Sequence, residues 1–156
     1  AVDLLGCDVC LNPHAHDFAE QLANSCPDGM DNYFENVGDK VFDAVLPLLN
    51  TSARIPLCVL VSGYHATELP EGPERVPLLM ATLLKKRIRL QGFIISQDYG
   101  HRIDEFQHDM SQWIAEGKIH YREQIIDELE SAPESFIGML AGKNFGKVVI
   151  QVGAAD

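Results

Sequence analysis

The apolar run at residues 55–61 (IPLCVLV) restricts the fold of this chain more than any other stretch. Short runs of this kind with β-branched residues, bounded by polar ones, are typical of a strand buried on both faces, as in a parallel sheet. In open α/β sheets, ligands bind just beyond the carboxyl ends of the strands. We therefore expect functional groups where Ser62, Gly63 and Tyr64 follow the run.

Composition limits the classes of partner. The 156 residues are enough for a domain with a real core, and 46% hydrophobic with 22% charged residues is ordinary for a globular protein. A net charge of −11 argues against nucleic acid or an anionic membrane as the main partner. With four cysteines expected to be reduced thiols and no apolar run long enough to span a bilayer, we expect a cytoplasmic protein.

Strand and helix patterns alternate through residues 1–117, which predicts an α/β fold with a parallel sheet. The expected strands cover residues 8–12, 30–37, 55–61 and 87–95. The expected helices cover residues 17–26, 39–50, 77–86 and 98–117, with Pro47 awkward inside the second.

The tail at residues 118–156 breaks this alternation, so we assign it to another structural unit. It shows short strands within 119–126, a helix from Ser131 that stops at Gly142, and a last strand at 147–152. At the other end, the residues up to Gly6 resemble the last turn of a helix, so we expect the chain to belong to a longer protein.

A metal site is considered first among the candidate sites. Cys7 and Cys10 form a C-x-x-C pair, followed closely by His14 and His16. Two thiolates and two imidazoles can hold zinc in a tetrahedral site. The histidines follow too closely for a finger-like loop, however, and a half-buried cysteine pair with two surface histidines is the favoured interpretation.

Catalytic motifs are sparse. The sequence has no glycine-rich phosphate loop and no G-x-S-x-G, although a Ser62 nucleophile with a His65 base is geometrically conceivable. Tyr64 is a better candidate, because a phenol at the mouth of a sheet can bind a sugar hydroxyl or protonate a carbanion; packing on a nearby proline is the equal alternative. Asn36 and Asn144 can each hold a ligand or merely complete a turn.

Four separate motifs resemble one family. They are ENVG at 35–38, LVSGYHATELPEGP at 60–73, LKKRIRLQGFI at 84–94 and LAGKNFGKVV at 140–149. In this order they resemble the zinc-independent alkenal/prostaglandin reductase branch of the medium-chain dehydrogenase/reductase superfamily, and within it the bacterial NADPH-dependent curcumin reductase group. The resemblance covers essentially the whole chain.

The resemblance implies a fold. Residues 1–117 would be the C-terminal part of a Rossmann-type doubly wound parallel sheet, comprising strands three to six. Residues 118–156 would return to a GroES-like catalytic domain. The first two strands, the glycine-rich pyrophosphate turn and the N-terminal domain would then be missing. In the strand order 3-2-1-4-5-6, strand four would be left with a bare edge.

The resemblance also implies an activity. NADPH would give a hydride to the β-carbon of an enone or enal, with protonation at the α-carbon and no need for a metal. Tyr64 would assist proton delivery. The implied cofactor-binding residues are Asn36, Cys58, Ser62, Gly63, Tyr64, Phe93, Ile94, Ile95 and Asn144.

Two further expectations concern the context of this site. The resemblance implies a homodimer that pairs through the edge strand from Arg87 to Ile95, with a small-molecule enone or enal as substrate. Gly63, His65 and Asp39 depart from the family pattern, which affects substrate preference. The chain by itself is expected to be inactive, and a non-catalytic α/β module that associates with itself is the alternative function.

Overall fold

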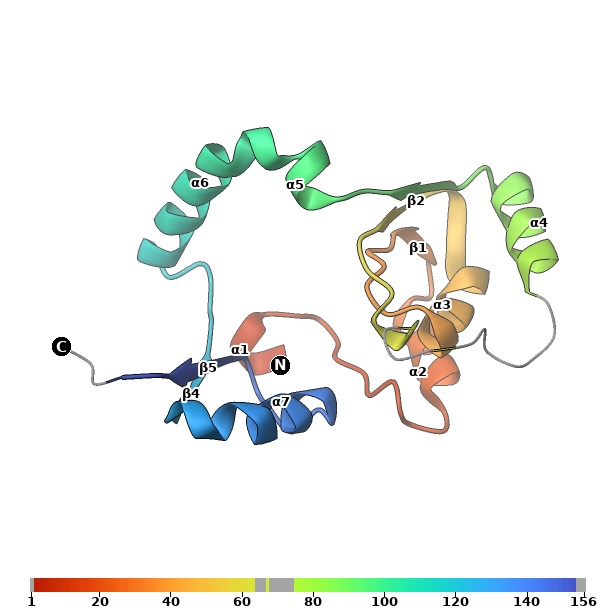
Figure 1. Ribbon diagram of the computed structural model, residues 1–156. Coiled ribbons are helices and arrows are strands. Elements are labelled where there is room, and N and C mark those ends of the chain that lie inside the picture. Colours follow the sequence, from red (N-terminus) through yellow and green to blue (C-terminus); the bar gives the residue numbers. More distant parts are fainter. Residues whose placement is uncertain (1, 64–66, 68–74, 154–156) are drawn as a thin grey trace. The chain divides into compact units, whose positions relative to one another are not determined.

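A computed structural model describes residues 2–63, 67 and 75–153. They form two compact units, Ala1–Phe106 and Gln107–Asp156, each of which is described by itself (Figure 1). The helices are α1 (Val2–Leu5), α2 (Phe18–Ser25), α3 (Asp39–Val45), α4 (Val76–Lys86), α5 (Ile95–Asp98), α6 (Ile103–Ala115) and α7 (Ala132–Leu140). The strands are β1 (Met30–Asn32), β2 (Leu49–Leu57), β3 (Arg89–Gly92), β4 (Glu123–Asp127) and β5 (Lys147–Gln151). Short 3-10 turns are η1 (Leu46–Leu48), η2 (Val61–Gly63), η3 (Gly100–Arg102) and η4 (Leu129–Ser131).

The first unit contains a three-stranded parallel sheet in the order β1-β2-β3. Arg54 lies opposite Asn32 on one side and Arg89 on the other, so β2 is the central strand. Beyond β1, Glu35 forms one more bridge, to Leu57. The parallel α/β fold is confirmed, and the adjacency of the three strands matches that expected for strands four, five and six.

Several strand predictions are corrected. The run predicted at 55–61 begins earlier, at Leu49, because Leu49 pairs with Met30 of β1. Residues 50–52, whose side chains lie largely at the surface, fall in the register shift between that pair and Arg54. It also ends earlier, at Leu57, because the N–H groups of both Cys58 and Val59 donate to the carbonyl of Glu35. The strand predicted at 30–37 covers only Met30–Asn32, and its register with β2 already shifts between these two residues. Residues 8–12 form no strand.

Two helix predictions are also corrected. The helix predicted at 39–50 ends at Val45 and tightens into η1, where Pro47 lies in the first turn. The helix predicted at 98–117 begins only at Ile103, after α5 and η3. Since α5 starts at Ile95, the strand predicted at 87–95 is limited to Arg89–Gly92.

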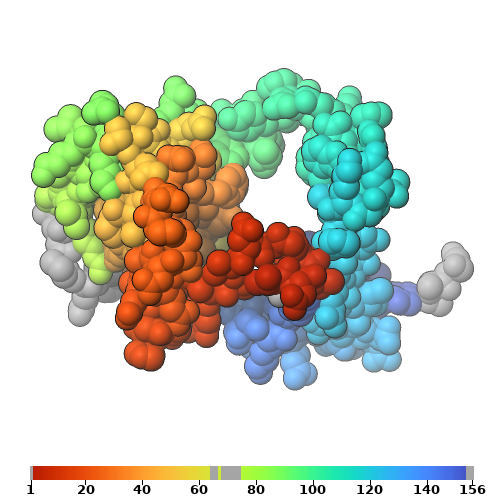
Figure 2. All heavy atoms as spheres, turned by 180° about the vertical axis from the view of Figure 1, so that it is seen from behind, coloured from red at the N-terminus to blue at the C-terminus, as the bar shows by residue number. Residues whose placement is uncertain are grey.

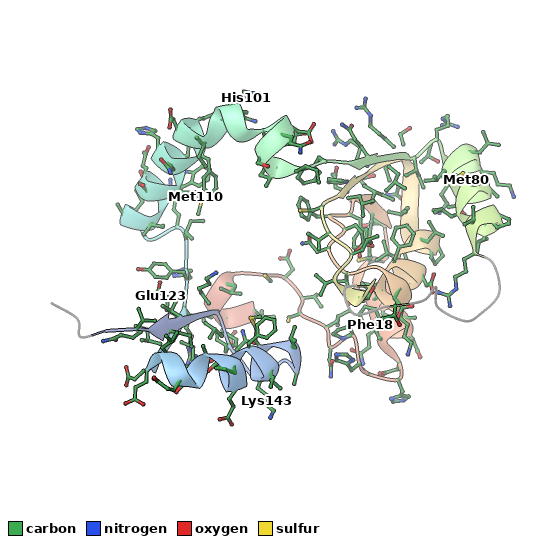
Figure 3. All side chains as sticks on the ribbon, in the orientation of Figure 1. Phe18, Met80, His101, Met110, Glu123 and Lys143 are labelled. Atoms are coloured by element: carbon green, nitrogen blue, oxygen red, sulfur yellow. The ribbon has the colours of Figure 1, made fainter. Side chains whose placement is uncertain are left out.

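The core of the first unit lies around β2. Its buried side chains are Val45, Leu46, Leu49, Ala53 and Ile55. The helices add partly buried residues to it: Leu22 from α2, Phe42 from α3 and Leu79 from α4. Met80, one position further along α4, is exposed and labelled in Figure 3, as expected when only one face of a helix is buried. The space-filling view shows α4 lying against β2 (Figure 2).

Lys86 joins the end of α4 to the start of β2. Its ammonium donates to the carbonyl of Pro47 at 2.9 Å and to that of Leu49 at 2.6 Å. Arg87 then takes a left-handed conformation as the C-cap of α4 and lets the chain turn into β3. These contacts fix where β3 begins beside β2.

The second unit is built on β4 and β5, which pair in parallel from Glu123 opposite Lys147 to Asp127 opposite Gln151. A parallel pair needs a crossover connection, and η4 with α7 provides it. The predicted helix and last strand in this tail are confirmed to within one residue, and Gly142 lies just past the helix end with φ +68°.

No helix in the described part of the chain combines the length and hydrophobicity needed to cross a bilayer.

Candidate functional site

The carboxyl ends of β1, β2 and β3 meet at one edge of the first sheet, because the strands are parallel. Backbone hydrogen bonds join the segments that leave the first two strands. Val61 donates to the carbonyl of Asn36 at 3.1 Å, and Ser62 donates to that of Val37 at 3.0 Å. The third segment is joined by Phe93, whose N–H donates to the carbonyl of Leu57 at 3.3 Å. We call these three segments, residues 33–38, 58–63 and 93–98, the carboxyl edge.

Glu35 is the buried acid of the carboxyl edge, with 1% of its surface exposed. Its Oε1 accepts hydrogen bonds from the backbone N–H of Val37 at 2.6 Å and of Gly38 at 2.8 Å. Its Oε2 has no hydrogen-bond partner with adequate geometry among the described residues. Burial, followed by the nearby charge of Glu35 and its hydrogen bonding, raises the pKa of the Tyr33 phenol well above its ordinary value.

Gly38 shows how tightly the first two segments pack. Its φ of +82° lies in the left-handed region, which glycine adopts at no steric cost. A Cβ at this position would lie 3.1 Å from Oγ of Ser62 and 3.2 Å from Cδ2 of Leu60. The turn after β1 therefore lies directly against η2.

A cavity of about 550 Å³ opens where the second and third segments leave the sheet. Its lining residues are Leu57, Cys58, Val59, Leu60, Gly92, Phe93, Ile94 and Asp98. The walls are mostly apolar, with one thiol and one carboxylate. Such a composition suits a flat, weakly polar ring that is oriented by a few polar groups.

Asp98 holds the third segment of the carboxyl edge in place. Its Oδ2 accepts from the N–H of Ile94 at 2.7 Å, while its own N–H donates back to the carbonyl of Ile94 at 2.9 Å. The ring of Phe93 adds edge contacts, at 6.1 Å from the ring centre of Phe34 and 5.6 Å from that of Tyr99. This segment is therefore shaped by side chains as well as by the sheet.

Most of the cofactor-binding residues expected from the sequence lie on the carboxyl edge. Cys58, Phe93 and Ile94 line the cavity, and Ile95 begins α5 beside them in the chain. The other edge residues, Asn36, Ser62 and Gly63, lie on the two joined segments.

Two predicted residues fall elsewhere. Tyr64, like His65, lies outside the described residues. Asn144 belongs to the second unit, where its amide donates to the carbonyl of Gly146 at 3.1 Å and thus completes a turn.

Glu35 is the residue that sequence reasoning missed. The ENVG motif drew attention to Asn36, whose side chain is exposed. The signal in the sequence was the spacing between Glu35 and the turn, since an acidic side chain can accept hydrogen bonds from the backbone N–H groups two and three residues after it. The burial of Glu35 depends on packing against β2, and no local sequence pattern predicts it.

A family model described as zinc-binding dehydrogenase matches residues 5–150. The chain belongs to this family. The NADPH-dependent curcumin reductase of Escherichia coli is 73% identical over 156 residues, which is 100% of this chain and 45% of that protein. The 2-alkenal reductase of Nicotiana tabacum is 38% identical, over 97% of this chain and 44% of that protein. Prostaglandin reductase 1 of Rattus norvegicus is 34% identical, over 94% and 44%.

Solved structures agree with these relatives. CurA from Vibrio vulnificus, solved in complex with NADPH, superposes with a TM-score of 0.92 at 64% identity, covering 98% of this chain and 45% of that one. An NAD-dependent alcohol dehydrogenase superposes at 0.69 with 23% identity, which shows the fold alone. The chain spans less than half the length of the relatives it matches.

The family's description mentions zinc, which proteins bind through Cys, His, Asp and Glu side chains. Across residues 2–63, 67 and 75–153, no three His, Cys, Asp or Glu side chains lie close enough together to hold a metal ion. Cys7 and Cys10 are both exposed free thiols. We therefore assign no zinc ligands to the described residues.

Proposed function

We propose that this chain supplies the nicotinamide side of the cofactor site in an NADPH-dependent reductase of carbon–carbon double bonds in α,β-unsaturated ketones and aldehydes. The observation that carries the proposal is the 73% identity, over every residue of the chain, with an NADPH-dependent curcumin reductase. Because the chain spans 45% of that relative, the activity is proposed for the whole protein that carries this sequence.

The carboxyl edge fits one half of a dinucleotide. The apolar cavity suits the faces of the nicotinamide ring, and its lining includes Cys58, Phe93 and Ile94. The joined segments carrying Asn36, Ser62 and Gly63 offer polar groups for the adjacent ribose. We also propose Ile95 and Asn144 as cofactor-binding residues of the whole protein. The sequence contains no glycine-rich phosphate loop, so the pyrophosphate contacts would come from elsewhere in the whole protein.

The chemistry divides between the cofactor and the protein. When bound, NADPH supplies the hydride that adds to the β-carbon of the substrate. Tyr64 donates the proton that the α-carbon needs, which completes the saturated product. The apolar lining of the cavity limits water on the side of the nicotinamide ring that it covers. The proposal gives no role to zinc.

The first prediction concerns Tyr64. In the whole protein, Tyr64→Phe should lower kcat for enone reduction by about 100-fold and change the Kd for NADPH by no more than about threefold, because phenylalanine keeps the aromatic ring and loses only the proton donor. Calorimetric titration gives Kd, and the loss of NADPH absorbance gives kcat. Tyr121→Phe is the matched control, since the side chain of Tyr121 is exposed.

The same titration tests the assignment itself. We expect NADPH to bind to the whole protein and not to the isolated 156-residue chain. Binding to neither would remove the cofactor assignment and favour the non-catalytic module that associates with itself. An unchanged kcat in Tyr64→Phe would remove only the role of Tyr64.

We further propose that the whole protein is a homodimer, paired through the strand between Arg87 and Ile95. In the described sheet β3 has β2 on one side only. Because Phe93 donates its N–H to β2, strand alternation turns the N–H of Gly92 toward the open edge.

Gly92→Pro removes that donor and should convert the dimer to a monomer in sedimentation experiments, whereas Gly92→Ala should remain dimeric. A monomeric wild-type protein would contradict this.

Two assignments complete the proposal. We assign residues 1–117 to the nucleotide-binding domain of the whole protein and residues 118–156 to its catalytic domain. In the sequence, the boundary between the two described units lies within α6, between Phe106 and Gln107. We also propose a cytoplasmic location, which is supported by the four free cysteines.

A further inference from the structure

Glu35 has an unusual combination of chemistry and position. It is a carboxylate with 1% of its surface exposed, and burying such a group is costly unless its hydrogen bonds repay the loss of water. No arginine or lysine forms an ion pair with it among the described residues. The hydrogen bonds that oppose this cost come from the backbone N–H groups of Val37 and Gly38, and the Tyr33 phenol interacts with the same carboxylate.

The backbone of Glu35 is also the junction between β1 and β2. Its N–H donates to the carbonyl of Pro56 at 2.9 Å, and its carbonyl accepts from Cys58 at 3.0 Å and from Val59 at 3.3 Å. One residue thus connects the end of the central strand to the first segment of the carboxyl edge. The side chain connects this junction to the next turn.

The effect continues along the chain. The residues shaped by the carboxylate, 36–38, accept the hydrogen bonds of Val61 and Ser62 and pack against them at Gly38. Without an acceptor on residue 35, the N–H groups of Val37 and Gly38 would be left unpaired, the latter at a buried position, and the turn would rearrange to reach water. Any rearrangement there displaces η2.

We propose that Glu35 is a positioning residue for cofactor binding. Its carboxylate fixes residues 36–38, and through them Val61–Gly63, in the shape that the nicotinamide half requires before the cofactor arrives. The role depends on the reach of an acceptor oxygen and not on the negative charge. This inference rests on the proposed function, because it takes NADPH to be the ligand of the carboxyl edge.

Two substitutions in the whole protein separate reach from burial. Glu35→Met keeps the length of the side chain, removes both acceptors and removes a buried charge. It should leave the protein folded, with thermal stability equal to or above that of the wild type, and weaken the Kd for NADPH by about tenfold or more. Glu35→Gln keeps one acceptor oxygen and should restore the affinity to within about threefold of the wild type. Glu20→Ala, at an exposed position on α2, is the control.

A merely structural role predicts a different pattern. In that case Glu35→Met would change the melting temperature while the folded fraction bound NADPH with wild-type affinity, and that result would overturn the inference. Equal losses in Glu35→Gln and Glu35→Met would also overturn it, because the charge would then be the active property. If the wild-type protein binds no NADPH, it is the proposed function that fails.

A second measurement needs only the wild-type protein. Without NADPH, the amides of Val37 and Gly38 should exchange hydrogen as slowly as those of Val61 and Ser62, and NADPH should slow all four by only a few fold. Fast exchange at Val37 and Gly38 that becomes slow only when NADPH is added would show that the cofactor itself shapes the turn. That outcome would overturn prior positioning by Glu35 even if the Glu35→Met protein does not fold.

Discussion

Replacing Ile55 with alanine is expected to lower the free energy of unfolding of the first unit by about 2–5 kcal/mol. Ile55 is fully buried in the central strand and packs in the same cluster as Val45 and Leu49. Truncation would remove three carbon atoms from a core with only five buried apolar side chains among the described residues, so few neighbours can close the cavity. Urea denaturation followed by far-ultraviolet circular dichroism measures the change.

Two matched variants test the cause of this loss. Ile55→Val removes one methylene and should cost about 1 kcal/mol. Ile103→Ala makes the same chemical change at a side chain that is 51% exposed and should cost less than about 1 kcal/mol. An Ile55→Ala protein no less stable than Ile103→Ala would contradict the position of the core.

The second large effect is expected for Gly146→Ala in the other unit, at about 2–5 kcal/mol. Gly146 has φ +84°, and a Cβ there would lie 2.2 Å from the backbone carbonyl oxygen of Arg122. That oxygen accepts the N–H of Lys147 at 2.9 Å, directly before β5 pairs with β4. The substitution therefore combines a strained backbone with a collision against backbone that cannot yield without loss of strand pairing.

Gly142→Ala is the control for Gly146→Ala. Gly142 has a similar φ of +68°, but a Cβ there would meet nothing within 4 Å, so only the conformational cost of about 1–2 kcal/mol is expected. Hydrogen exchange at the amides of β4 and β5 reports the stability of the pair. Equal effects of the two substitutions would mean that the collision with Arg122 is relieved.

Helices with local signals could be predicted from the sequence. The apolar spacing of α2 and α4 and the glycine that follows α7 marked these elements to within one or two residues. The single long helix predicted at 98–117 was wrong. The carboxylate of Asp98 accepts a hydrogen bond from the N–H of Ile94, and this contact favours a separate short helix, α5. Ile94 lies before the predicted start of the helix, so the helix pattern could not include it.

Strand ends could not be predicted as well, because each depends on a partner that is distant in the sequence. Leu49 is the first residue of β2 because Met30 lies opposite it, and nothing in the polar residues 50–52 announces this pairing. Val9, in the strand predicted at 8–12, is 49% exposed, so its apolar character did not lead to pairing.

The candidate site divides in the same way. The rule that ligands bind at the carboxyl ends of parallel strands drew attention only to the turn after residues 55–61. Cys58, Phe93 and Ile94 came from the family resemblance, and in the structure all three line one cavity. The buried carboxylate of Glu35 escaped the sequence analysis, because its environment is made by β2 and by the N–H groups of its own turn.

The strand order of the first sheet also has a consequence for synthesis on the ribosome. Because β1, β2 and β3 are neighbours in the same order as they occur in the sequence, each strand can add to an edge that has already left the exit tunnel. Among the described strands of this sheet, none has to be inserted between two earlier ones. The nascent chain can therefore assemble the sheet one strand at a time, and the carboxyl edge is complete once the residues after β3 have emerged.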